Sequence, residues 1–282
     1  MTSTRPSCPV CANAETRVYV EFSELTFSEC TGCGVVFRTR EQPNLLPAGF
    51  YEQSYFHGRK SGRDRRFEHR VRKAQSWISD CVDGRPNATS LLDVGCSFGY
   101  VLEGARRLGL NAAGVDISEY AVERCRTLGF DAQVGAVDAI PYPEASFDVV
   151  IMKHVLEHTP SPLKALSEAK RVMKPGGQLL IAVPDLDYWK GRWWRKRGRY
   201  FVPTELGAQH YVYFHADGLA RALSSQGFEV KLRSKAYLRR QVPGRAFETL
   251  RYLAMRAWQG LAAGVHMRRE LYFVGQAPPQ AG

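Results

Sequence analysis

The sequence predicts an α/β protein with a doubly wound, Rossmann-like sheet and a small cysteine-rich ribbon at its N-terminus. Three observations predict this fold. From residue 91 onward, short apolar runs alternate with amphipathic stretches of helical length, which is typical of successive βαβ units. A glycine-rich turn follows the first of these runs, at residues 95–99. Two Cys-x-x-Cys pairs lie within the first 33 residues, a segment too small to form a core unaided.

The segment from Leu91 to Asp116 is the first βαβ unit. Its expected parts are a strand, a turn, a helix and a second strand, at residues 91–94, 95–99, 100–108 and 112–115. The second strand ends on an acid, Asp116, about 20 residues past the glycine turn. This is the layout that binds the ribose hydroxyls of an adenosine-type cofactor.

The glycine pattern indicates which cofactor binds. A dinucleotide site needs the pattern G-x-G-x-x-G, so that backbone amides can reach a pyrophosphate. Ser97 and Tyr100 stand where its second and third glycines would be, and Asp93 before the turn would repel a pyrophosphate. An acid there suits a ligand with an ammonium group, which favours S-adenosylmethionine. The alternative is any doubly wound domain with a glycine turn.

Four cysteines form two knuckles, Cys8 with Cys11 and Cys30 with Cys33, separated by eighteen residues that contain short strands. Two thiolate pairs on opposing turns predict a closed tetrahedral zinc site that serves structure and not catalysis. Redox pairs or chance are the alternatives. Because the chain has seven cysteines and no expected export signal, we do not expect a disulfide framework.

The rest of the chain continues the α/β pattern. Further strands are expected at residues 131–134, 147–152, 178–183, 228–232 and 271–275. Helices are expected at residues 62–81, 118–128, 162–173, 215–226 and 245–265, with an exit turn at 174–177. The loop 135–141 lies at the carboxyl edge of the sheet, where ligands of open α/β sheets bind.

The segment after the strand 147–152 carries His154, Glu157 and His158. If this segment is helical, the two histidines share one face. A metal site of the HExxH type is not expected, because Glu157 is in the wrong place for it.

The length of 282 residues predicts one or two domains, and the net charge of +11 is unevenly distributed. His57 to Lys73 holds eight Lys/Arg, and Lys190 to Arg199 holds six and no acid. The basic flanks favour an anionic partner, such as a nucleotide-linked sugar, a phosphate-bearing precursor or a nucleic acid, against arginine used only for solubility. Neither a transmembrane segment nor a signal sequence is expected, which predicts a cytoplasmic protein.

LLDVGCSFG, GVDIS, FDVV, HVLEHTPSP and RVMKPGGQLLIAVP, in this order, resemble the class I S-adenosylmethionine-dependent methyltransferases. CPVC…CTGC with FYEQSYF is similar to the branch with an N-terminal zinc ribbon, which includes sugar C-methyltransferases. The resemblance implies a seven-stranded sheet whose last strand is antiparallel, S-adenosylmethionine as cofactor and Zn²⁺ as a structural metal.

The resemblance also implies a set of donor-binding residues. Those on the methionine side are Asp93, Gly95, Cys96, Ser97 and Gly99. Asp116 would bind the ribose, Ile117, Val137 and Asp138 would surround the adenine, and Lys153 and His154 would line the floor beneath the sulfonium. Two positions depart from the family: Ser97 replaces its usual glycine, and Ala136 replaces an aspartate.

On the acceptor side, Gln209-His210 resembles an E-H-x-x-x-F element with glutamine in place of the acid. His210 is the leading candidate for the general base, against a structural histidine, and His154 and His158 are further candidates. Tyr55 belongs to an expected lid. The segment 184–212, with tryptophans beside arginines, is expected to meet the acceptor; an amphipathic surface helix is its alternative.

These observations predict a zinc ribbon at 1–45, a helical linker or lid at 46–88 and a methyltransferase domain at 89–282. The expected activity is methyl transfer to a small acceptor bearing a sugar or a phosphate. An RNA or protein methyltransferase and a non-catalytic zinc- and nucleoside-binding module are the alternatives. The acceptor, the methylated atom and the oligomeric state do not follow from the sequence.

Overall fold

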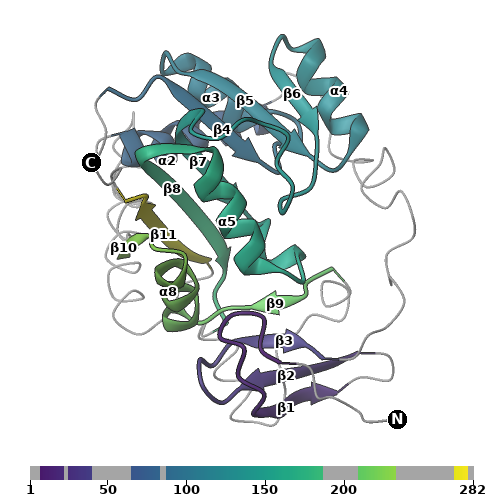
Figure 1. Cartoon of the computed structure of the whole chain (residues 1–282). Helices are drawn as coiled ribbons and strands as arrows, with labels where there is room; N and C mark the ends of the chain where they lie inside the picture. Colours follow the sequence, from purple (N-terminus) through teal and green to yellow (C-terminus); the bar gives the residue numbers. More distant parts are fainter. Residues whose placement is uncertain are drawn as a thin grey trace, which may run out of the picture.

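A seven-stranded sheet of order β10-β11-β8-β7-β4-β5-β6 forms the centre of the computed structural model, which describes residues 7–21, 25–39, 65–82, 87–186, 209–232 and 270–278 (Figure 1). The strands are β4 (Ser90–Val94), β5 (Asn111–Asp116), β6 (Asp131–Val134), β7 (Phe147–Lys153), β8 (Met173–Pro184), β10 (Glu229–Leu232) and β11 (Glu270–Gln276). β4 to β8 run parallel, whereas β11 is antiparallel to both β8 and β10. The predicted sheet with an antiparallel last strand is confirmed.

Helices cover both faces of this sheet (Figure 1). They are α2 (Arg65–Val82), α3 (Tyr100–Arg107), α4 (Glu119–Thr127), α5 (Pro162–Val172), α8 (Ala216–Ser225) and the short 3₁₀ helix η1 (Leu156–His158). α5 and α8 pack on the face that carries Leu92 and Met152, and α2 and α3 on the face that carries Leu91 and Ile151. Because successive side chains of a strand point to opposite faces, both faces of the central strands are buried.

Local signals at the helix ends account for the predicted boundaries. The Ser118 hydroxyl accepts a hydrogen bond from the Ala121 amide at 3.3 Å and caps α4.

One boundary was predicted wrongly. Residues 174–177, expected as a turn, lie inside β8, which begins at Met173 and has a register shift against β7 there. The Gly177 carbonyl accepts from the Ala277 amide, so partners beyond the end of β11 hold this segment extended.

The N-terminal ribbon contains β1 (Thr16–Glu21), β2 (Thr26–Cys30) and β3 (Val36–Arg38). Its sheet gains a fourth strand from the second half of the chain, because β9 (Val212–Tyr213) pairs antiparallel with β3 (Figure 1). Val35 packs against Gly218 of α8, where an added Cβ would lie 2.7 Å from the valine. The ribbon therefore packs directly against the larger part of the chain.

Several predicted features lie outside the described residues. These are Tyr55 with its lid, most of the insertion at 184–212 and the helix at 245–265. The division into three parts at 1–45, 46–88 and 89–282 stays a prediction. Among the described residues, no helix combines the length and the apolarity needed to cross a membrane.

The amino end of β7 carries a buried carboxylate. Oδ2 of Asp148 accepts hydrogen bonds from the amides of Thr89 and Ser90 at 3.1 Å each, and from Lys174 Nζ at 2.9 Å. Burial alone would raise the pKa of Asp148, but the Lys174 ammonium and these hydrogen bonds hold it well below its ordinary value. The ionised carboxylate thus ties β7 to β4 and to the start of β8.

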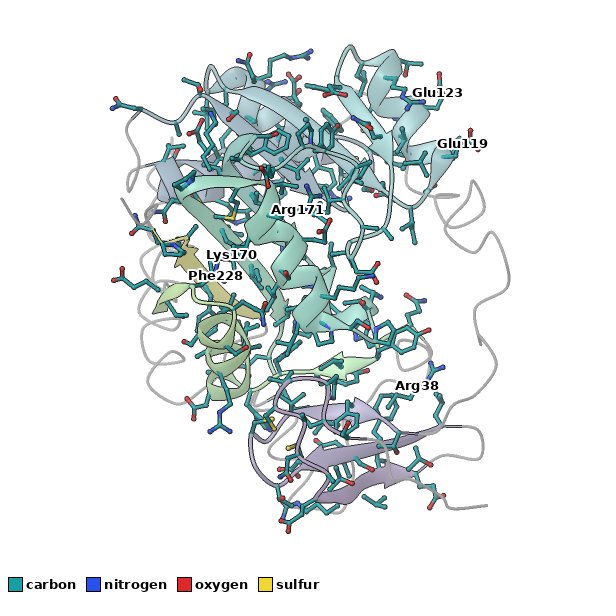
Figure 2. All side chains as sticks on the ribbon, in the orientation of Figure 1. Arg38, Glu119, Glu123, Lys170, Arg171 and Phe228 are labelled. Atoms are coloured by element: carbon teal, nitrogen blue, oxygen red, sulfur yellow. The ribbon has the colours of Figure 1, made fainter. Side chains whose placement is uncertain are left out.

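We expect Asp148→Asn to lower the free energy of unfolding by about 2 kcal/mol at neutral pH. Because the folded-state pKa is depressed, this contribution is fully present above the ordinary aspartate pKa of 3.8 and is lost as the pH falls below it. Urea unfolding between pH 7 and pH 3 measures the difference. Glu123→Gln, on the outer side of α4 (Figure 2), is the control and should change little. A constant deficit at all pH values would contradict the assignment.

Candidate active site

The turn after β4 passes very close to the segment after β7. Gly95 has φ +78°, and an added Cβ would lie 2.6 Å from Cγ2 of Val155. Only glycine fits, both because of this contact and because positive φ is unfavourable for other residues. The expected donor turn and the histidine-containing segment are therefore neighbours.

Ser97 lies in the same turn and also has a positive φ, 48°. Its amide donates to Asp116 Oδ2 at 2.9 Å, and its carbonyl accepts from the Cys125 thiol at 3.3 Å. These contacts offset the cost of a left-handed conformation in a non-glycine residue. Ser97 thus occupies the conformation for which related turns use glycine.

Two carboxylates face the turn. Asp116 accepts amide hydrogen bonds on both oxygens, from Ser97 and, at 3.0 Å, from Ser118. Asp93 is buried, with 3% of its surface exposed. Burial raises the pKa of Asp93 well above its ordinary value, and the negative charge of Asp116 raises it further. A ligand that brings a positive charge would relieve this repulsion, which fits the ammonium and sulfonium groups of S-adenosylmethionine.

Exposed apolar side chains lie beside Asp116 at the carboxyl edge. Ile117 is 53% exposed, and Val134, which is paired with Asp116 across β5 and β6, is 46% exposed. Apolar surface next to an acid that is expected to bind ribose suits an adenine ring. Val137 packs partly against the main core, and Asp138 pairs with Lys164 at 3.5 Å.

Side chains of α5 hold the loop that carries Val137 and Asp138 in place. The Ile140 amide donates to Glu168, and Arg171 (Figure 2) donates to the carbonyls of Ile140 and Tyr142. The loop therefore has a defined position at the edge of the sheet.

Two expected donor residues have side-chain contacts with other parts of the protein. Cys96 packs in the core beneath it, where its thiol lies 3.9 Å from that of Cys125 and against Gly114. The Lys153 ammonium lies over the Trp77 ring of α2, 4.9 Å from its centroid. Cys96 can therefore serve a donor through its backbone alone.

His154 follows directly after β7 and has φ +55°, so residues 154–158 are not one continuous helix. The condition under which His154 and His158 would share a helical face is therefore not met. Instead, His154 Nδ1 donates to Oε1 of Glu157 at 3.1 Å. Burial would raise the pKa of Glu157, but the hydrogen bond from His154 and the neighbouring histidines lower it. The sequence pattern indicated only that Glu157 does not belong to an HExxH metal motif. It did not predict the pairing of Glu157 with His154.

His158 and His210 meet although they are far apart in the chain. His158 Nδ1 donates to the Gln209 carbonyl at 2.9 Å, and the His158 and His210 rings stack edge to face with centroids 4.6 Å apart. His210 is 7% exposed. Burial lowers the pKa of His210 to about 4, although the negative charge of Glu157 acts to raise it. The structure thus brings together all three histidine candidates around Glu157.

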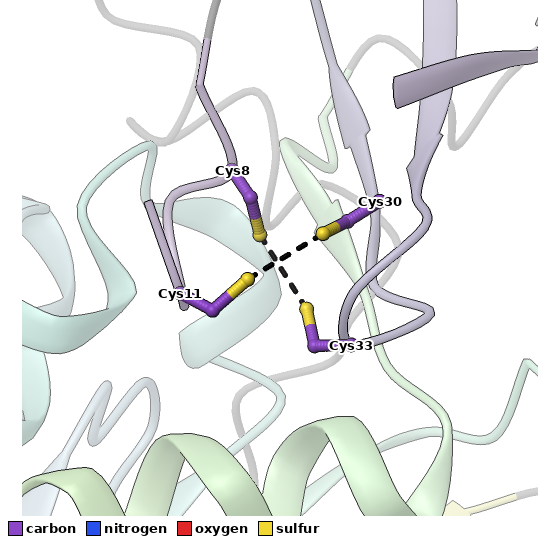
Figure 3. Close-up of side chains that lie close together, drawn as sticks. All are labelled: Cys8, Cys11, Cys30 and Cys33. Atoms are coloured by element: carbon purple, nitrogen blue, oxygen red, sulfur yellow. Dashed lines mark hydrogen bonds between the residues drawn. The ribbon is translucent and has the colours of Figure 1, made fainter. Parts of the chain in front are cut away.

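The four ribbon cysteines converge on one point (Figure 3). Cys8 Sγ lies 3.5 Å from Cys33 Sγ, and Cys11 Sγ lies 3.4 Å from Cys30 Sγ. In a tetrahedral site with metal–sulfur bonds of about 2.3 Å, the sulfurs are about 3.8 Å apart. Burial raises the pKa of Cys8 to about 11, and a divalent cation would reverse this shift. The cluster fits a four-thiolate metal site.

The strand order and the turn after β4 are those of the class I S-adenosylmethionine-dependent methyltransferases. The chain belongs to the methyltransferase-domain family, whose sequence model matches residues 66–232. The resemblance seen in the sequence motifs is thereby confirmed.

Curated relatives match parts of the chain. A probable S-adenosylmethionine-dependent methyltransferase of Mycolicibacterium smegmatis is 31% identical over 144 residues, 50% of this chain and 52% of that protein. A ubiquinone biosynthesis O-methyltransferase of Alkalilimnicola ehrlichii is 29% identical over 113 residues, 38% and 45% of the two chains. This chain thus spans about half the length, or less, of these relatives.

Solved structures share the fold. A SAM-dependent methyltransferase from Archaeoglobus fulgidus has a TM-score of 0.52 at 18% identity, covering 79% of this chain and 99% of that one. A Pyrococcus horikoshii protein has a TM-score of 0.53 at 14% identity, covering 80% and 99%. At these identities the likeness concerns the fold alone.

We expect Ser97→Gly to keep the free energy of unfolding or raise it by up to about 1 kcal/mol, because glycine relieves the left-handed strain. Ser97→Val should lower it by about 1–2 kcal/mol, because a β-branched residue is least tolerated at positive φ. Both variants keep the amide that bonds Asp116. Chemical denaturation gives the stabilities, and calorimetry with S-adenosylhomocysteine gives the affinities. A glycine variant less stable than the valine variant would contradict the strain argument.

Proposed function

We propose that this chain transfers the methyl group of S-adenosylmethionine to a hydroxyl of a small acceptor that bears a sugar or a phosphate. One observation carries the proposal: a histidine held by a buried carboxylate, His154 with Glu157, follows directly on β7 and adjoins the donor turn through Val155. Transfer to a hydroxyl requires a proton acceptor, whereas donor binding alone does not. Proteins named O-methyltransferases among the relatives agree with this choice.

Charge supports an anionic acceptor. The chain has a net charge of +11, and its lysines and arginines concentrate in segments that flank the donor-binding fold. A phosphate or a nucleotide-linked sugar would be attracted by such a field. The sequence also contains tryptophans at positions 189, 193 and 194, outside the described residues, and tryptophan rings are of the kind that stack on sugars and bases.

When bound, S-adenosylmethionine supplies an electrophilic methyl group on a sulfonium. In the proposed arrangement Asp116 would accept hydrogen bonds from the ribose hydroxyls and Asp93 would balance the charge of the ammonium. Ile117 would contribute apolar surface for the adenine. Because the displacement is in line, the main task of the protein is to align the acceptor oxygen, and correct alignment contributes several kcal/mol.

His154 is the proposed proton acceptor. Its Nδ1 hydrogen is donated to Glu157, so Nε2 carries the lone pair that takes the proton of the acceptor hydroxyl. His154 has 38% of its side chain exposed, whereas His210 is buried. Gln209 cannot orient His210 as an acid would, but Glu157 can orient His154. For these reasons we place His154 ahead of His210, the leading candidate from the sequence.

We also propose that Cys8, Cys11, Cys30 and Cys33 bind a structural Zn²⁺. Four sulfur ligands leave no position open for chemistry. The metal would instead fix the ribbon, whose strand β3 pairs with β9 two residues after His210. Zinc would thus stabilise one wall of the acceptor side.

We expect His154→Ala to reduce turnover by on the order of 100-fold or more, while the affinity for S-adenosylhomocysteine stays within about twofold. The acceptor is first sought among sugar nucleotides and phosphorylated alcohols, by following S-adenosylhomocysteine release. His69→Ala, exposed on α2, is the control and should leave turnover unchanged. Equal losses in both variants would contradict the role of His154.

The same acceptor screen distinguishes the proposed activity from its alternatives. Methylation of RNA, with binding that falls steeply as salt is added, would overturn the small-molecule acceptor. Donor binding without turnover on any acceptor would instead favour a non-catalytic binding module.

Removing zinc with a chelator should release about one equivalent from the four-cysteine site and increase hydrogen exchange in β1, β2, β3 and β9, while β4 to β8 stay protected. Cys11→Ser should behave likewise, because serine is a poor zinc ligand. Glu15→Gln, exposed between the two cysteine pairs, is the control. Unchanged exchange in β9 after complete zinc loss would contradict the proposed coupling.

A further inference from the structure

A second group of metal-ligand side chains lies on the acceptor side, outside the ribbon. Glu157 and His158 come from η1, and His210 lies shortly before β9. One ligand atom from each lies within 4.8 Å of the other two. Among the residues that the structure describes, this group and the four cysteines are the clusters with metal-ligand spacing.

Two atoms of this group are buried without a hydrogen-bond partner. They are Oε2 of Glu157 and Nδ1 of His210, in residues that are 1% and 7% exposed. The neighbouring Tyr213 hydroxyl is also buried and unpartnered. Each such atom costs about 1–3 kcal/mol if nothing compensates it. Two unpartnered buried atoms, in residues whose ligand atoms converge from different parts of the chain, indicate a missing ligand.

The surroundings resemble the outer shell of a metal site. A ligating histidine commonly donates its second ring N–H to a backbone carbonyl, which fixes the ring and its tautomer. His158 does this toward Gln209, so its Nε2 carries a lone pair. Oε1 of Glu157 is held by His154, which leaves Oε2 to bind the ligand.

We propose that Glu157, His158 and His210 bind a divalent transition-metal ion of the zinc class, at a site separate from the four cysteines. Two imidazoles and one carboxylate form a ligand set that suits such ions and not Mg²⁺, which prefers oxygen ligands and retained waters. Three protein ligands leave at least one coordination position open. Because Val155 contacts Gly95, this site adjoins the donor turn, and the open position can take a water or an acceptor hydroxyl.

Metal binding here does not require the proposed acceptor. It can be measured without any methylation, so its failure would leave the proposed methyl transfer untouched. Conversely, a failed acceptor search would not affect the measured metal content.

The test uses the full chain, stripped with a chelator and reloaded with Co²⁺. We expect two ions per chain, one showing the thiolate-to-cobalt charge-transfer band of a four-cysteine site and one lacking it. Glu157→Gln and His158→Ala should each reduce the content to one ion and keep the charge-transfer band. Excess Mg²⁺ should not displace the second cobalt.

His69→Ala is the matched control and should keep two ions. An unchanged charge-transfer band and unchanged affinity for S-adenosylhomocysteine show that a variant is folded. One ion in the wild-type protein would overturn the proposal and leave a buried water as the partner of Oε2 and Nδ1. Two ions in both the Glu157→Gln and the His158→Ala variants would also overturn it, because the second ion would then lie elsewhere.

A diffraction experiment at the cobalt absorption edge locates the second ion directly. An anomalous peak between Glu157, His158 and His210 supports the assignment. A peak at the four cysteines alone overturns it.

Discussion

The hydrogen bonds that Asp116 accepts from the Ser97 and Ser118 amides are the constraint on which the donor side depends. They join the end of β5 to the turn after β4 and to the start of α4. Because both oxygens accept amide hydrogen bonds, the carboxylate keeps one orientation, and in the proposed donor site the ribose hydroxyls would meet a fixed acceptor. Asp93 is buried nearby, so its carboxylate lies in a low-dielectric region close to the negative charge of Asp116. The proximity of these two carboxylates therefore favours a cationic ligand.

The acceptor side depends on a second chain of contacts, which begins in the ribbon. The Arg38 amide donates to the Tyr211 carbonyl, and the Tyr211 amide donates to the Glu157 carbonyl. Tyr211 thus connects β3 to the backbone of Glu157, whose carboxylate the histidines surround. In the proposed enzyme the ribbon is consequently part of the acceptor wall, and its metal acts at a distance through backbone pairing.

The sequence predicted what depends on local patterns. The alternation of apolar and polar residues, Ser118 as a cap and the paired cysteines each act within a few residues, so the strands, helix ends and metal knuckles were predictable. The convergence of Glu157, His158 and His210 was not, because it depends on β9 pairing with a strand of the ribbon. Nor could spacing show that the Cys96 side chain enters the core, since that follows from its contact with Gly114. Short strands such as β9 have too few residues for a periodic signal.

His154 shows how the two sides are joined. A left-handed φ costs a histidine about 1–2 kcal/mol that it would not cost a glycine, and the chain places a histidine there. Its amide donates to Ala182 at 2.8 Å and its ring to Glu157, contacts that hold the conformation. The same bend turns Val155 onto Gly95 and Glu157 inward. The backbone alone would favour glycine at this position, so the histidine side chain is the feature that needs an explanation. In the proposed reaction, its position between the donor turn and the Glu157 carboxylate is where a proton-accepting group would act.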